Sequence, residues 1–220
     1  GDLHWQNRLP EASAQIASVY LPERAQGFVT PALTRLGAGD RLYPFDGTIL
    51  FCHRLIFPRR DTGATPWRVE ALRKRAGLAG APRGKRRLYI YRHAFARRRI
   101  ANDKALERLL AAYGFEAVNP GALSFDDQVK LFSEAAIVLG PHGAGLANAI
   151  FMSRGGALIE LTHDRRVFRT FYEVAAASGH AYALVIGDAA GDDKESILAD
   201  FTVDPDAVEA AIKAALAAIA

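Results

Sequence analysis

A glycine-rich turn that follows an apolar run is the segment of this sequence best suited to chemistry. Residues 136–139 read Ala-Ile-Val-Leu and lead into residues 140–145, Gly-Pro-His-Gly-Ala-Gly. The backbone N–H groups of Gly143, Ala144 and Gly145 would begin the next helix, where the positive end of the helix dipole attracts anions. Glycines also let a phosphate approach the backbone, so the turn suits a diphosphate. A tight strand-to-helix turn needs the same glycines, and on the residues alone both interpretations stay open.

The turn differs from the fingerprint of dinucleotide-binding proteins. Residues 143–148 place Asn148 where the third glycine of that fingerprint belongs. The turn also comes late in the series of apolar runs, whereas the fingerprint occupies the first strand-to-helix turn. These two differences argue against a nicotinamide-dependent dehydrogenase.

Further residues have side chains that can bind a nucleotide sugar. Arg92 follows an apolar run and Arg98 precedes a helix, and a guanidinium group can hold a phosphate with two hydrogen bonds. Glu160 ends the strand after the turn, where an acid can accept hydrogen bonds from ribose hydroxyls. His142 can bond a phosphate or a sugar. Each has a structural alternative: the arginines can pair with surface acids, Glu160 can serve the fold, and His142 and Asn148 can bond locally.

Apolar runs and amphipathic segments alternate from about residue 86 onward. Residues 136–139 are apolar throughout, as expected of a central parallel strand buried on both faces. Strand-helix alternation of this kind is typical of an α/β fold with a Rossmann-like, doubly wound parallel sheet. The predicted strands are 88–91, 115–118, 136–139, 157–161 and 182–186, and the predicted helices are 102–113, a segment opened by Ser124, 143–151 and 167–177.

Three parts are predicted along the chain. Residues 79–200 form the Rossmann-like domain, entered through a linker at 80–84 that contains glycine and proline. Residues 1–78 form a partial α/β domain, and residues 201–220 a last helix that we expect to pack back across it. The acidic stretch 188–195 indicates a solvated loop. In the first part we predict a helix at 10–20, short strands at 28–29 and 48–51, and a helix at 65–77.

Composition excludes several classes of protein. The chain has 220 residues, of which 50% are hydrophobic and 24% charged, which is typical of a globular protein and not of a disordered one. No run approaches the roughly 20 apolar residues of a membrane span. The single cysteine, Cys52, excludes an internal disulfide and a cysteine-based metal site and favours a reducing compartment. We therefore expect a cytoplasmic protein, with room for peripheral contact at the inner face of the membrane.

The positive charge of the chain is concentrated in one segment. The net charge is only +4, yet eight of the 17 residues from 83 to 99 are basic. Such a segment favours binding of an anionic partner: a phosphate, a nucleic acid or a membrane surface. The eight residues are Arg83, Lys85, Arg86, Arg87, Arg92, Arg97, Arg98 and Arg99.

The motifs around the turn resemble those of glycosyltransferase family 61. Residues 126–152 contain Asp-Asp-Gln-Val-Lys-Leu-Phe-Ser-Glu-Ala, then Val-Leu-Gly-Pro-His-Gly-Ala-Gly-Leu-Ala-Asn and Phe-Met. The likeness extends to Tyr-Ile-Tyr-Arg at 89–92, Arg-Arg-Ile-Ala-Asn at 98–102, Leu-Ile-Glu-Leu at 158–161 and Phe-Tyr-Glu-Val-Ala at 171–175. The family includes protein O-linked N-acetylglucosaminyltransferases, plant xylosyltransferases and many bacterial polysaccharide enzymes, and we identify the chain as a bacterial-type member.

The resemblance implies an activity and an arrangement of domains. The family implies transfer of a sugar, with inversion, from a nucleotide sugar (a UDP-sugar by our expectation) to a hydroxyl of a glycan or polysaccharide. It implies a GT-B-type arrangement, here with a short or truncated N-terminal domain on the acceptor side and the nucleotide in the C-terminal domain. Neither a cofactor nor a metal is expected. The only Asp-x-Asp, at residues 204–206, is better interpreted as a helix cap.

A shorter match near the start of the chain concerns the general base. His4-Trp5 followed by Leu-Pro at 9–10 resembles the amino-proximal His-Trp motif of the family. An imidazole that titrates near neutral pH can accept the proton of the acceptor hydroxyl, so His4 is the candidate base and Glu11 the reserve. Two departures stand out: Arg8 occupies a position where we expect an acid, and Ala147 one where we expect a hydroxyl residue.

A non-catalytic module of the same fold is the alternative. In that hypothesis the domain binds a nucleotide sugar, or the basic segment 83–99 holds a polyanion, with Tyr89 and Tyr91 as platforms on which bases stack. Alternate tyrosines of a strand point to one face and more often serve packing, so nucleic acid is the less favoured partner.

Overall fold

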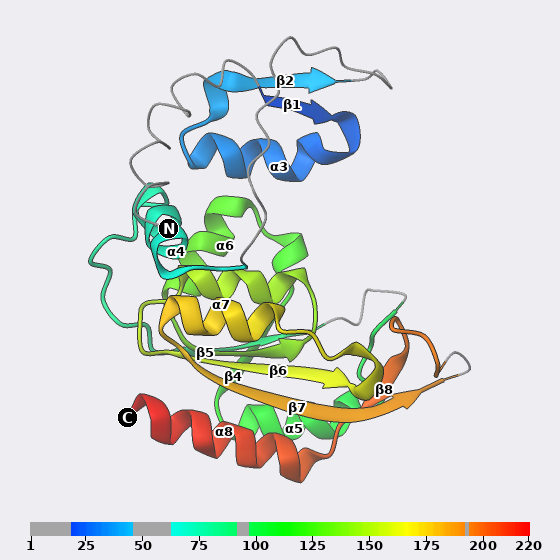
Figure 1. Cartoon of the computed structure of the whole chain (residues 1–220). Helices are drawn as coiled ribbons and strands as arrows, with labels where there is room; N and C mark the ends of the chain where they lie inside the picture. The colour runs from blue at the N-terminus through cyan, green and yellow to red at the C-terminus, as the bar shows by residue number, and fades with distance from the viewer. Residues whose placement is uncertain (1–18, 46–62, 92–96, 192–193) are drawn as a thin grey trace. The chain divides into compact units, whose positions relative to one another are not determined.

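The computed structural model in Figure 1 describes residues 19–45, 63–91, 97–191 and 194–220. The chain divides into two compact units, Gly1–Asp61 and Thr62–Ala220. This division falls before the boundary at residue 78 that we predicted, because the helix predicted at 65–77 belongs by its contacts to the second unit. The acceptor-side role of the first part stays a prediction.

The first unit, where the structure describes it, is a small α/β element. β1 (Val19–Pro22) pairs in parallel with β2 (Leu42–Phe45), and α3 (Glu23–Arg35) and η1 (Gly39–Arg41) connect them. The strand predicted at 28–29 is wrong, because these residues lie inside α3. The helix predicted at 10–20 lies outside the described residues except for its end, which belongs to β1. The strand predicted at 48–51 also lies outside the described residues.

The second unit is built on a six-stranded sheet with the order β4-β3-β5-β6-β7-β8. All neighbouring strands are parallel except β8, which pairs antiparallel with β7. The predicted α/β fold with a parallel sheet is confirmed for the first five strands, and β8 was not predicted. The strands are β3 (Arg86–Ile90), β4 (Phe115–Val118), β5 (Ala135–Pro141), β6 (Ala157–His163), β7 (Ala181–Ala190) and β8 (Asp200–Thr202).

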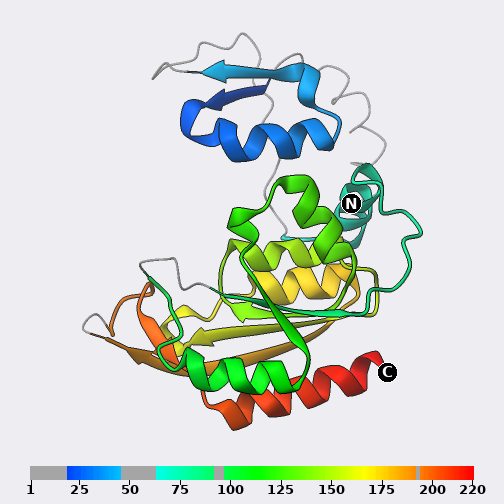
Figure 2. The ribbon, with the colours of Figure 1, turned by 180° about the vertical axis from the view of Figure 1, so that it is seen from behind.

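Helices cover both faces of this sheet, as the two views show (Figures 1 and 2). One face carries α4, α6 and α7 together with the 3₁₀ helix η3, and the other carries α5 and α8. The helices are α4 (Pro66–Arg75), α5 (Asp103–Ala112), α6 (Phe125–Ser133), η3 (Ala144–Phe151), α7 (Thr170–Ser178) and α8 (Pro205–Ile219), with short 3₁₀ turns η2 (Pro120–Ala122) and η4 (Asp164–Arg166).

Alternation along the strands explains the two hydrophobic cores. Successive side chains of a strand point to opposite faces. In β3, Leu88 and Ile90 lie in the core under α6 and η3, whereas Tyr89 lies in the core that holds α5 and α8. β5 divides in the same way, with Val138 in the first core and Ile137 in the second. The sheet is therefore buried on both faces, as the apolar run predicted.

The last helix packs on the sheet of the second unit. α8 makes its main contacts with β6, β7 and α5 of that unit. The packing of residues 201–220 across the first unit stays a prediction. The apolar stripe of α8, which includes Val208 and Ile212, lies in the core on that face of the sheet. Asp204 caps the helix by accepting a hydrogen bond from the Asp206 N–H, so the interpretation of Asp-x-Asp as a cap is confirmed.

A buried arginine fixes the far end of η3, the helix that begins at the glycine-rich turn. Arg73 of α4 is only 6% exposed, and its guanidinium group donates hydrogen bonds to the carbonyls of Phe151 and Met152, the former at 2.9 Å. A cation at these carbonyls satisfies helix-terminal acceptors that have no partner within the helix. Arg73 therefore joins α4 to the end of η3, the helix that follows the turn.

We expect Arg73→Met to lower the free energy of unfolding by about 2–4 kcal/mol, because it leaves several buried carbonyls without a charged donor. Urea unfolding followed by circular dichroism measures this change. Lys74→Met, at the next and exposed position of the same helix, is the matched control and should stay within about 0.5 kcal/mol of the wild type. Equal effects of the two substitutions would contradict the capping role of Arg73.

Candidate functional site

The glycine-rich turn lies at the switch point of the sheet. From β3 the chain moves to β4 at one edge, and it then returns to form β5 on the other side of β3. In open α/β sheets ligands bind at the carboxyl ends of the strands, where the strand order reverses in this way. Residues 142–145 follow β5 directly, so the fold places them where such ligands bind.

The glycines of the turn have a packing role that the sequence did not reveal. A Cβ on Gly140 would lie 2.9 Å from Cβ of Ile90, and one on Gly145 would lie 3.2 Å from Cγ2 of the same residue. Because glycine has no side chain, these two positions let β5 and η3 approach β3 closely. Gly143 has φ 171°, an extended conformation open to any residue, and it is buried. Ala144, at the first position of η3, is exposed.

The helix after the turn is a 3₁₀ helix, and its side chains tie it to the fold. Asn148 is buried and donates from its amide nitrogen to Oε1 of Gln128 in α6 at 2.9 Å. The Gln128 amide in turn donates to the carbonyl of Leu123. This network gives Asn148 a structural role, and its predicted contact with a donor stays a prediction. His180 adds a second tie, because its Nε2 lies 3.0 Å from the carbonyl oxygen of Ala149.

Two of the predicted residues meet inside the protein. Nδ1 of His142 is hydrogen-bonded to Oε1 of Glu160, and Oε2 of Glu160 accepts a hydrogen bond from the Tyr182 hydroxyl at 2.7 Å. Glu160 has no exposed surface, and His142 is 9% exposed. Both carboxylate oxygens are thus engaged within the protein. This arrangement favours an orienting role for Glu160, while the ribose contact that we predicted for it stays a prediction.

Two arginines lie beside this pair. Arg98 donates to the carbonyl of His142 at 3.2 Å, has φ 60°, and keeps a buried Nε without a hydrogen-bond partner among the described residues. Arg166, in η4 after β6, was missed by the sequence analysis. Within the described part of the chain its Nε is likewise buried without a hydrogen-bond partner, and its charge interacts with Arg98 and with Glu160. Burial lowers the pKa of both guanidinium groups, which remain charged. Together they add positive charge at this edge of the sheet.

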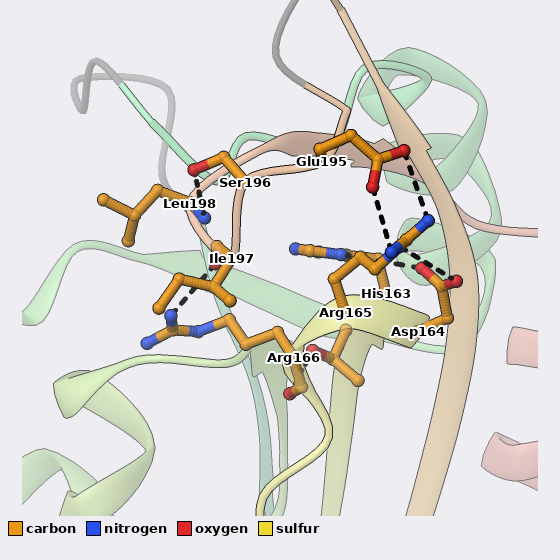
Figure 3. Close-up of polar contacts among 9 residues, drawn as sticks. His163, Asp164, Arg165, Arg166, Glu195, Ser196, Ile197 and Leu198 are labelled. Carbon is orange, nitrogen blue, oxygen red and sulfur yellow. Dashed lines mark hydrogen bonds and ion pairs between the residues drawn. The ribbon is translucent and has the colours of Figure 1, made fainter.

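A neighbouring segment holds Arg166 in position (Figure 3). Arg166 donates to the carbonyl of Ile197 at 3.0 Å, and Arg165 forms an ion pair with Glu195 at 3.0 Å. The guanidinium carbon of Arg166 also lies 5.5 Å from the centre of the Phe168 ring. The acidic stretch that we predicted to be a solvated loop is therefore partly structured, since residues 188–190 pair with β8 and Glu195 pairs with Arg165.

The structure leaves three predicted residues untested. His4, Glu11 and Arg92 lie outside the described residues, and their roles stay predictions. Among the residues that the structure describes, no group of three or more His, Cys, Asp or Glu side chains could hold a metal ion. No helix in the described part of the chain is long and apolar enough to cross a membrane.

Five basic residues of segment 83–99 that the structure describes have partners within the protein. Arg98 bonds the turn, and Arg99 forms an ion pair with Asp200 at 2.8 Å. Arg86 pairs with Glu116 and Glu134. Arg83 and Arg87 donate to backbone carbonyls. These partners disfavour a continuous surface for a polyanion.

Comparison with known proteins identifies the family. A sequence model of the family Glycosyltransferase 61 matches residues 4–159, which is more than half of the chain. The chain therefore belongs to glycosyltransferase family 61. The match includes the turn at 142–145 and ends one residue before Glu160. No individual curated protein matches the chain.

We expect the stability of the protein to fall as the pH drops below about 6.5, the pKa of an unfolded histidine. His163, at the end of β6, is fully buried, and burial is the main cause that lowers its pKa; the same holds for His180. The unfolded chain thus binds protons first, and each histidine adds a slope of at most about 1.4 kcal/mol per pH unit. Urea unfolding of His163→Leu between pH 7 and 5 should give a shallower slope than the wild type. An unchanged slope would contradict the lowered pKa of His163.

Proposed function

We propose that this family member transfers a sugar from a nucleoside diphosphate sugar, with a UDP-sugar as the expected donor, to a hydroxyl of a glycan or polysaccharide. The proposal includes inversion at the anomeric carbon and a GT-B-type arrangement in which the second unit binds the donor. The observation that carries it is the position of the turn 142–145 at the switch point of the sheet, beside Arg98 and Arg166.

The chemistry of the leaving group supports this assignment. Breaking the bond to the sugar leaves a nucleoside diphosphate with additional negative charge. Fixed dipoles and cations aimed at developing charge stabilise a transition state. The backbone N–H groups at the beginning of η3, with His142, Arg98 and Arg166 nearby, offer such an environment without a metal ion. Arg92 is proposed as a further phosphate ligand.

Activation of the acceptor requires a base. We propose His4, in the part of the chain that we expect to form the acceptor side, and hold Glu11 in reserve. A positioned base contributes about 10²–10⁴-fold to a rate. A non-catalytic module that only binds the donor remains the alternative; it predicts donor binding without turnover, while the polyanion form of it is disfavoured by the internal partners of the arginines.

Ala144→Asp tests the donor site directly. Ala144 is exposed at the first position of η3, and an acid there suits the helix dipole, so the fold should be unaffected. The added negative charge should repel a diphosphate and weaken UDP binding about ten-fold or more, which corresponds to about 1.4 kcal/mol. Isothermal titration calorimetry with UDP measures the change. Ala214→Asp, an exposed site on α8 at the other face of the sheet, is the control. Unchanged UDP affinity in Ala144→Asp would remove the turn from the site.

His4→Ala tests the base. Turnover of the donor, once an acceptor is found, should fall by about 10²–10⁴-fold while UDP affinity stays unchanged, because the proposed donor ligands are elsewhere in the chain. Glu11→Gln is the companion variant. Running the assay in excess EDTA tests metal independence at the same time. Near-normal turnover of His4→Ala would assign the base elsewhere, and loss of activity in EDTA that Mn²⁺ restores would contradict the metal-free proposal.

A further inference from the structure

Three side chains form a chain of hydrogen bonds across three neighbouring strands. His142 follows the carboxyl end of β5, Glu160 lies in the middle of β6, and Tyr182 lies near the beginning of β7. Glu160 is at the centre, with one oxygen bonded to Nδ1 of His142 and the other to the Tyr182 hydroxyl. Nothing in the sequence motifs linked Tyr182 to the site.

The chemistry of the carboxylate fixes the direction of both bonds. An ionised carboxylate accepts hydrogen bonds and donates none. Burial, together with the bond to Glu160, raises the pKa of Tyr182 far above its usual value, so the phenol keeps its proton and donates a hydrogen bond to Oε2. Oε1 must then accept a hydrogen bond from the N–H at Nδ1 of His142. The ring nitrogen left for a ligand is Nε2.

The ring of His142 is held firmly in this orientation. Phe171 packs edge-on at 5.0 Å between ring centres, and Phe168 lies at 5.6 Å. The His142 backbone is bonded on both sides, its N–H to Leu161 at 2.8 Å and its carbonyl to Arg98. Among the described residues none hydrogen-bonds Nε2, and the side chain keeps 11% of its surface exposed.

The charges around the ring favour an anion at Nε2. Glu160 supplies one negative charge, while Arg98 and Arg166 supply two positive charges. On α7, which provides Phe171, the charged groups Arg169 and Glu173 pair with each other at 3.7 Å. A second proton on Nε2 makes His142 a cation that Glu160 stabilises and that can donate to a phosphate oxygen.

We propose that Glu160 and Tyr182 are positioning residues that hold His142 with its proton on Nδ1, so that Nε2 takes a second proton and donates it in a hydrogen bond to the diphosphate of the donor. The inference rests on the proposed function and deepens it. Binding of the diphosphate is then coupled to the uptake of one proton from solvent, with no covalent step. Glu160 acts on the donor through His142 and not by direct contact.

Nitrogen-15 NMR of the histidine rings tests the positioning without any ligand. In the wild type, the His142 signals, assigned by their loss in His142→Gln, should show the proton on Nδ1 at neutral pH. Glu160→Gln should shift the population toward the Nε2–H tautomer, and Tyr182→Phe should do so partially while keeping the carboxylate. Tyr172→Phe is the matched control, because Tyr172 contacts the Tyr182 ring, is 55% exposed and is not bonded to Glu160. An Nε2–H tautomer in the wild type would overturn the inference.

Affinity as a function of pH tests the coupling. For the wild type, the affinity for UDP and for inorganic pyrophosphate should fall as the pH rises from 5.5 to 8.5, by at most ten-fold per pH unit for one proton. Tyr172→Phe should follow the wild type, whereas Glu160→Gln should bind more weakly and with a flatter profile. Thermal unfolding shows whether each variant is folded. If Glu160→Gln does not fold, the pH profile of Tyr182→Phe is compared with that of the wild type instead.

The outcomes separate this inference from the proposed function. UDP binding with the same pH profile in the wild type, Glu160→Gln and Tyr182→Phe would overturn the role of Glu160 and leave the donor assignment intact. If UDP and pyrophosphate bind at no pH, the donor assignment fails and the ligand half of the inference fails with it. The NMR result still decides the positioning of His142 in that case.

Discussion

The buried carboxylate of Glu160 is the constraint on which the contact between the glycine-rich turn, β6 and β7 depends. Removing a carboxylate from water costs several kcal/mol unless hydrogen bonds replace the lost hydration. Here the replacements come from His142 after β5 and Tyr182 in β7, so one side chain joins three strands. Register is part of this arrangement: Gly140 is the partner of Glu160 in β5, and Leu184 its partner in β7. A slip of one residue would turn Glu160 to the other face of the sheet, where these donors are absent.

Close packing of the backbone complements this polar constraint. Gly140 and Glu160 lie side by side, and the space that a side chain at 140 would fill is taken by Ile90 of β3. Gly145 approaches the same isoleucine from the beginning of η3. Arg73 then anchors the end of η3. Packing thus fixes the turn and the beginning of η3, and hydrogen bonds fix the end of η3.

The sequence predicted those features that depend on local pattern. Strand-helix alternation indicated the five parallel strands, and Ser124 was predicted to open a helix, which its hydrogen bond from the Asp127 N–H confirms. Features that depend on distant partners were missed. Arg73 has the pattern of an exposed helical residue, and only its carbonyl partners about 80 positions later explain its burial. Tyr182 and Arg166 belong to no motif near the turn. β8 is three residues long, which is too short to show the alternating apolar pattern of a strand. The apolar pair at 28–29 lies in a helix, α3, that also contains Pro31.

Two energetic costs at this edge point to the same class of ligand. Arg98 has a left-handed backbone conformation that is uncommon outside glycine, and such strain tends to occur at functional sites. Its charge also repels that of Arg166, and each guanidinium keeps a buried Nε to which none of the described residues is hydrogen-bonded. Like charges held close together destabilise a fold unless something of opposite sign lies nearby. Glu160 supplies one such charge, but its oxygens are already bonded to His142 and Tyr182. The diphosphate of a nucleotide sugar carries two negative charges, which together with Glu160 balance both arginines and a protonated imidazole, whereas a neutral sugar carries none. The electrostatic balance of the protein therefore favours an anionic donor at the turn.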